Sequence, residues 1–165
     1  MITREERIGK DGNMTLKVWE LISIILSALV VGMFCGPWAA LTRSMNTFGP
    51  EVYLAIGHRL VKNVAPVMTV LMPVALLSIL PVLFISYHAR PRTFYLASTG
   101  FALFLIALIV TLLVEAPISR RVKVWTMGTL PDNWQQLRDR WGTFHIVRVV
   151  ASVAGLGLLV GGAIF

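Results

Sequence analysis

Trp, Arg and His side chains gather just before and within the last apolar segment of the chain. Read as a helix from about Asp132, five of them recur at steps of four, three, four and three residues, on one face: Trp134, Arg138, Trp141, His145 and Arg148. From Ile146 the residues turn almost wholly apolar, so His145 and Arg148 lie inside a segment suited to a membrane. Ionisable side chains are costly there and usually serve a function.

Further polar residues should lie at the same end of the molecule. Glu115 ends the third apolar segment, and a short polar stretch precedes the second, so both meet the start of the fourth. A histidine or Glu115 could act as a base, and Arg148 could stabilise an oxyanion. We therefore expect His145, Arg148 and Glu115 to be catalytic. The residues expected to bind substrate are His58, Lys62, Asn63, Trp134, Arg138 and Trp141.

The simpler alternative is that these groups are interfacial. Arg and Trp are common at membrane boundaries, where long side chains reach the headgroups. In that case Arg148 would extend to the headgroups and Glu115 would pair with Arg120, leaving His145 bonded only to backbone. We expect instead that His145 faces the interior, that Glu115, His58 or Lys62 approaches it, and that Glu115 pairs with Arg148.

The elements that must position these residues are membrane helices. The chain has 165 residues, 56% of them hydrophobic and only 14% charged. Its apolar runs have membrane-spanning length and are expected near Val18–Ala40, Val64–Tyr87, Phe94–Val114 and Thr143–Ala163. We predict an all-α integral membrane protein, a four-helix transmembrane bundle with a long amphipathic connection before the last helix. Residues 1–17 would form a polar segment, disordered or on the membrane surface, and 18–165 the membrane domain, with both termini on one side.

Prolines and small residues add local expectations. Prolines within the second span predict bends that frame a cavity, Pro117 should stop or kink the helix after Glu115, and Thr129 should cap the last helix. Small residues allow close helix packing in two places. They are Ala28, Gly32, Gly36 and Ala40 in the first span, and Gly155, Gly157, Gly161 and Gly162 in the last.

Charge and cysteine content restrict the partners. The net charge of +7 fits Lys and Arg at span ends that meet anionic lipid headgroups, so we expect a lipid bilayer and a lipophilic small molecule as partners, and no nucleic acid. The small-residue faces would also permit a homo-oligomer. If Arg59, Lys62 and Arg138 line a cavity, the remaining charges favour cytoplasmic termini in a bacterial inner membrane. A single cysteine, Cys35, excludes an internal disulfide.

No cofactor is expected. The sequence has no phosphate loop, dinucleotide fingerprint, nucleophile elbow or haem attachment site. The one metal alternative is a two-histidine, one-carboxylate set of His58, His145 and Glu115. No close-spaced ligand motif supports it, so we expect no metal site.

These residues carry a resemblance to a known family. Glu-Ala-Pro-Ile after the third span, a Trp-rich connection, and Arg-Trp-Gly-Thr-Phe-His-Ile-Val-Arg at the start of the fourth resemble the anthrone-oxygenase-like family of small membrane proteins. The resemblance covers most of the chain after residue 17 and is most specific at Pro117, Trp134, Trp141, His145 and Arg148. Family members often have Asn after that proline, where this chain has Ile118.

The resemblance implies an activity. Members that act in polyketide pathways oxidise anthrones to anthraquinones with molecular oxygen and no recognised cofactor. The leading hypothesis is therefore a membrane-embedded, oxygenase-like enzyme for a lipophilic aromatic or quinone-like molecule, with His145 as base and oxygen as co-substrate. The alternative is a non-catalytic membrane protein that binds or passes a lipophilic ligand, or a partner subunit. A polar pocket beneath Trp141 would favour the enzyme.

Overall fold

The protein is a bundle of long helices. A computed structural model describes the backbone of residues 4–165 and the side chains of residues 12–41 and 43–165, and this part contains no strand. Its elements are α1 (Arg4–Ala40), a 3₁₀ turn η1 (Thr42–Thr47), α2 (Pro50–Ala89), α3 (Pro91–Val110), a π-helical turn η2 (Thr111–Glu115), α4 (Ala116–Val122) and α5 (Trp134–Ile164). Four stretches are long and apolar enough to cross a membrane, which confirms the predicted fold class.

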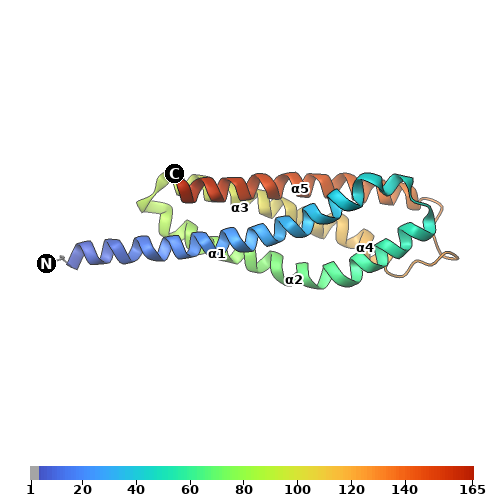
Figure 1. The fold of residues 1–165 in the computed structure, drawn as a ribbon, viewed down its shortest axis with the longest axis horizontal. Helices are drawn as coiled ribbons and strands as arrows, with labels where there is room; N and C mark the ends of the chain where they lie inside the picture. Colours follow the sequence, from blue (N-terminus) through green and yellow to red (C-terminus); the bar gives the residue numbers. More distant parts are fainter. Residues whose placement is uncertain (1–3) are drawn as a thin grey trace.

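The four long helices form a closed ring. α1 packs against α2 and α5, and α3 packs against the same two helices (Figure 1). The start of α1 and the end of α5 lie at one end of the bundle, and the α4–α5 connection lies at the other (Figure 1). Val30, Phe34, Ile79 and Phe104 are nearly inaccessible at the centre of the core. The chain is therefore a multi-pass membrane protein whose polar turns meet at two ends.

Two helices begin earlier than the sequence predicted. α2 begins at Pro50 rather than near Val64, since a proline in the first turn with Glu51 beside it is a favourable helix start. α1 begins at Arg4, so the segment expected to be disordered or on the membrane surface is helical over its described part. Arg, Glu and Lys are good helix formers, and the first proline of α1 is Pro37. Residues 1–3 lie outside the described residues.

Pro117 does not stop the third span, which was one of the two effects predicted for it. The helical path continues through α4, because the preceding π turn changes the bonding pattern: the Ala116 N–H reaches the Thr111 carbonyl, five residues back. Pro117 has no N–H to donate, and it occupies the first turn of α4, where none is needed. The π turn thus ends at Glu115, and the helix continues through Pro117 into α4.

The start of the last helix also differs from the prediction. Asn133 precedes α5 and makes no side-chain capping bond, and the Thr129 hydroxyl instead accepts a hydrogen bond from the Thr126 N–H within the connection. Because the Thr129 hydroxyl takes part in this local turn, it does not cap α5 as the sequence predicted. The predicted face of α5 is confirmed, because Arg138, His145 and Arg148 are all buried.

Small residues bring α3 and α5 together. A Cβ added at Gly100 would lie 2.9 Å from the Gly155 carbonyl oxygen, and the Thr93 hydroxyl bonds the Gly162 carbonyl at 2.9 Å. By contrast, Gly32 and Gly36 of α1 have open space around them, so that face has no helix against it within this chain. The close packing expected in the last span is found at its glycines that face α3.

The charge argument for orientation fails. Arg59 and Lys62 are exposed and line no cavity, and Arg138 pairs with Asp139 at 2.8 Å. The condition that favoured cytoplasmic termini is therefore not met.

Candidate functional site

A cavity of about 510 Å³ lies inside the bundle near the η2–α4 end. α1, α2, η2, α4 and α5 all contribute to its walls, which are mainly apolar and include four methionines, Met33, Met45, Met68 and Met72. The polar lining residues are Tyr53, Thr69, Thr111, Glu115, Ser119, Trp141, His145 and Arg148. The volume falls within the roughly 300–1,000 Å³ typical of small-molecule sites.

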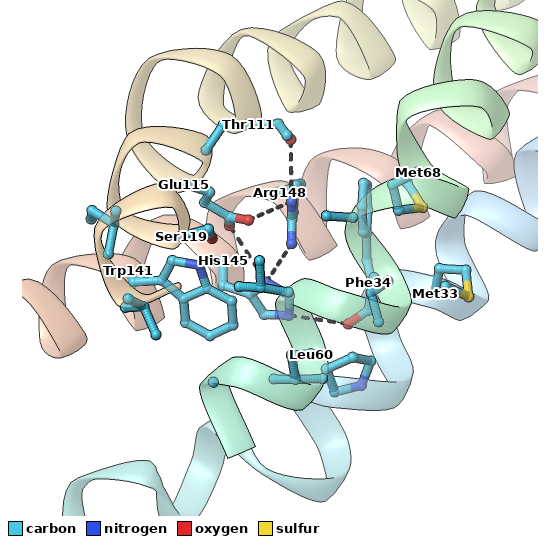
Figure 2. A pocket seen from close by; sticks show the side chains of 18 of the residues that line it. Met33, Phe34, Leu60, Met68, Thr111, Glu115, Ser119, Trp141, His145 and Arg148 are labelled. Atoms are coloured by element: carbon cyan, nitrogen blue, oxygen red, sulfur yellow. Dashed lines mark hydrogen bonds and ion pairs between the residues drawn. The ribbon is translucent and has the colours of Figure 1, made fainter. Parts of the chain in front are cut away.

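A buried ion pair stands on the cavity wall. Figure 2 shows Glu115, Arg148 and His145 turned toward one another from η2 and α5. Arg148 Nη1 pairs with Glu115 Oε2 and also donates to the Thr111 hydroxyl at 3.2 Å. The guanidinium carbon lies 4.0 Å from the centre of the Phe34 ring. Glu115 is 3% exposed and Arg148 8%, so each charge has left water and depends on these partners.

The hydrogen bonds of His145 define its tautomer. Arg148 Nη2 lies 2.7 Å from His145 Nδ1, and arginine only donates, so Nδ1 must be the acceptor. His145 Nε2 lies 3.1 Å from the Phe34 carbonyl oxygen, which only accepts, so Nε2 carries the proton. The ring is therefore neutral. Both of its nitrogens are engaged, whereas His145 was expected to act as the base.

One carboxylate oxygen of Glu115 therefore has no hydrogen-bond donor among the described residues. Oε1 lies 3.4 Å from His145 Nδ1, but that nitrogen has no hydrogen to donate in this tautomer. No other described residue gives Oε1 a hydrogen bond. Arg148 Nε is a second buried atom without a partner among the described residues. The expected pairing of Glu115 with Arg148 and its approach to His145 are both found.

The α1 and α5 helices fix the orientation of the imidazole. The Trp141 ring stacks on it at 4.7 Å between centroids, with the planes 14° apart. Pro37 interrupts the α1 hydrogen-bond ladder one turn after Phe34, and carbonyls near such a break can accept bonds from neighbouring helices. A mainly apolar cavity with polar groups on its wall thus lies beneath Trp141.

Two further residues of the predicted face lie outside the cavity. The Trp134 ring lies 5.2 Å from the Tyr53 ring, and the Arg138 guanidinium lies over Trp134 at 5.3 Å. Trp134 belongs to a second apolar cluster with Ile118 and Trp125, at the end of the bundle, and Arg138 contacts that cluster through the Trp134 ring. They close that end of the cavity rather than line it.

The polar residues of α2 also stay outside. His58 Nε2 bonds the Val122 carbonyl at 2.9 Å, while Lys62 and Asn63 are exposed. From Gly57 on, the lining residues of this helix are spaced three and one apart on a different face: Gly57, Leu60, Val61, Val64, Ala65, Met68, Thr69, Met72 and Pro73. His58 and Lys62 share a face as predicted, but that face is turned away from the cavity.

The donor set does not suit a metal ion. Among the residues with described side chains, no group of three His, Cys, Asp or Glu lies close enough to share one. His58 is held at the Val122 carbonyl and does not join His145 and Glu115.

Sequence reasoning missed several residues of the site. Thr111 lies four residues before Glu115, a spacing that could have identified it as a neighbour on one helix face. The methionines Met68 and Met72 show the same spacing on α2. Phe34 contributes through its ring and its backbone carbonyl, and a carbonyl leaves no mark in a sequence.

Comparison with known proteins identifies the family. No curated protein and no solved structure matches the chain. A family model described as anthrone oxygenase matches residues 59–158, more than half of the chain. The matched part contains Thr111, Glu115, Trp141, His145 and Arg148, and leaves out Phe34. The chain therefore belongs to the anthrone oxygenase family.

Proposed function

We propose that the protein is a membrane-embedded, oxygenase-like enzyme that oxidises a lipophilic aromatic molecule inside the bundle. The observation that carries the proposal is a buried Glu115–Arg148–His145 cluster on the wall of an apolar cavity of about 510 Å³. Buried ionisable groups inside a membrane span are costly and are usually kept for a function. Family membership supports the reaction type.

The walls suit a flat, water-insoluble substrate. Methionine side chains adapt to irregular apolar shapes, and the edge of the Trp141 ring offers an aromatic surface. Four lining residues, Ala65, Thr69 and Pro73 of α2 and Leu112 of η2, are also exposed. A substrate dissolved in the bilayer could therefore enter sideways, between α2 and η2, without crossing water.

The proposed chemistry is the oxidation of an activated methylene. A base removes a proton from the ring carbon, and Arg148 stabilises the resulting enolate. The electron-rich anion then reduces oxygen, and the overall change converts the CH₂ group and O₂ into a carbonyl group and water. The apolar walls exclude bulk water from the anion. The proposal includes no resident cofactor or metal and places the protein in a bacterial inner membrane.

Oxygen consumption tests the proposal. Purified protein in lipid nanodiscs would be given a hydroxylated anthrone, 1,8-dihydroxyanthrone, with wild type compared with His145→Ala and with His88→Ala as a matched control. His88 is exposed at the far end of α2. We expect anthraquinone formation by wild type and His88→Ala, also after dialysis against a chelator, and a loss of about a hundredfold in His145→Ala. Equal rates for the two variants would remove His145 from the mechanism. No turnover of any lipophilic phenol or anthrone would remove the enzyme class and leave a protein that binds or passes a lipophile.

A further inference from the structure

One strong acceptor on the cavity wall has no donor. Glu115 is 3% exposed, its Oε2 is paired with Arg148, and its Oε1 receives no hydrogen bond from any described residue. The nearby His145 Nδ1 is itself an acceptor, because it takes a hydrogen from Arg148. A buried charged acceptor without a donor is expensive, so a donor from a ligand would be strongly favoured at this position.

We propose that Glu115 Oε1 receives the hydroxyl group of the ligand, and that the cavity therefore selects lipophilic phenols and enols over their ethers and over plain hydrocarbons. The inference rests on the proposed function in taking the ligand to be the substrate, and it narrows that substrate's class. It also assigns the proton-accepting role to Glu115 in place of His145.

The surroundings of Oε1 disfavour ligand groups that only accept hydrogen bonds and ligand groups that carry a positive charge. A ligand carbonyl or carboxylate would place oxygen lone pairs against a carboxylate, which is repulsive. An ammonium group would meet Arg148, whose guanidinium is bound to the same carboxylate. A neutral hydroxyl donates to Oε1 without either conflict, and the apolar walls require the rest of the ligand to be lipophilic.

The same geometry defines where the proton would go. When the O–H bond of the ligand breaks, its electron pair stays on the ligand oxygen and the proton passes to Oε1. The anion that forms lies next to the positive charge of Arg148, whose Nε has no acceptor among the described residues. His145 then acts as a positioning residue: it accepts one Arg148 N–H and is held in place by the Phe34 carbonyl.

A pair of matched ligands tests the inference without relying on turnover. 2-Naphthol and 2-methoxynaphthalene would be titrated into the protein in lipid nanodiscs, with empty nanodiscs subtracted for partitioning. We expect wild type to prefer the naphthol by about tenfold or more, since a hydrogen bond to a charged acceptor is a strong one. Glu115→Gln should abolish the preference. Glu51→Gln, the same change at an exposed carboxylate of α2 that does not line the cavity, should retain it.

Fluorescence provides a second measurement in case Glu115→Gln does not fold. 2-Naphthol loses its proton in the excited state only when an acceptor is at hand, so wild type should show naphtholate emission from the bound ligand. Equal affinities of wild type for the two ligands, emission from neutral naphthol alone, or a preference that persists in folded Glu115→Gln would each overturn the inference. A clear naphthol preference without oxygen consumption would leave it standing and refute the proposed oxidation.

Discussion

Removing Arg148 alone from the buried ion pair should cost about as much as removing both charges together. In Arg148→Met the side-chain volume is roughly kept, but Glu115 remains buried with its charge. The variant loses the pair with Oε2, the bonds to Thr111 and His145, and the contact over the Phe34 ring. Breaking a buried pair in this way typically destabilises a protein by about 3–5 kcal/mol.

The structure places the expected cost at the lower end of that range. His145 Nδ1 is 3.4 Å from Glu115 Oε1 and, once released by Arg148, can take up a hydrogen and donate it to the carboxylate. We therefore expect about 3 kcal/mol for Arg148→Met, or more than a hundredfold in the unfolding equilibrium. Glu115→Gln should cost about 2 kcal/mol, because Arg148 keeps its bonds to Thr111 and His145 and the amide oxygen can still accept.

The double variant measures the coupling between the two residues. Glu115→Gln with Arg148→Met leaves no buried charge, so its cost should fall about 2 kcal/mol short of the sum of the single costs. Unfolding in mixed micelles with increasing SDS, followed by circular dichroism, would give all four free energies. Strict additivity of the two substitutions would refute the reasoning, because it would mean that neither charge depends on the other.

Two further predictions concern packing and topology. Gly100→Ala should destabilise the protein by about 1–3 kcal/mol in the same SDS titration, since its Cβ would lie 2.9 Å from a backbone oxygen of α5, whereas Gly32→Ala should have no cost because nothing lies within 4 Å; equal midpoints for the two variants would contradict this packing. In a cysteine-free background, single cysteines at Gly12 and Phe165 should react alike with a membrane-impermeant maleimide in sealed vesicles, and a cysteine at Val124 should show the opposite accessibility. Opposite labelling of the first two positions would disprove the four-span topology.

Much of the fold could be predicted because membrane helices are specified by long apolar runs. The four spans follow from composition alone, since a helix in lipid must satisfy its own backbone groups. Hydropathy could not predict where α2 begins, since residues 50–63 are too polar to be part of an apolar run. Pro50 followed by Glu51 was the signal for that start.

The predicted side-chain geometry was correct where the cost of burying charge decided it. Arg148 and His145 lie among apolar residues, so they had to face the interior, and Glu115 was the nearest counter-charge by topology. The prediction failed for Lys62, because polar character was taken as a sign of the site. In a membrane protein the wall of a cavity for a lipophile is itself apolar, so the polar face of α2 is the face that turns away.

The π-helical turn also determines how many residues a related chain can have between Thr111 and Glu115 and still form the ion pair with Arg148. At about 100° per residue, an ordinary α-helix would place Glu115 roughly 80° around from Ala107, which is fully buried on the inner line of α3. The π-helical turn offsets this rotation, so Glu115 lies on the same inner face of the helix as Ala107, eight residues before it. A chain with one residue fewer between Thr111 and Glu115 could reach the same position through a plain α-helix. Two homologous sequences can therefore differ by a gap at Leu113, on the exposed side of this turn, and still present the same carboxylate to the same arginine.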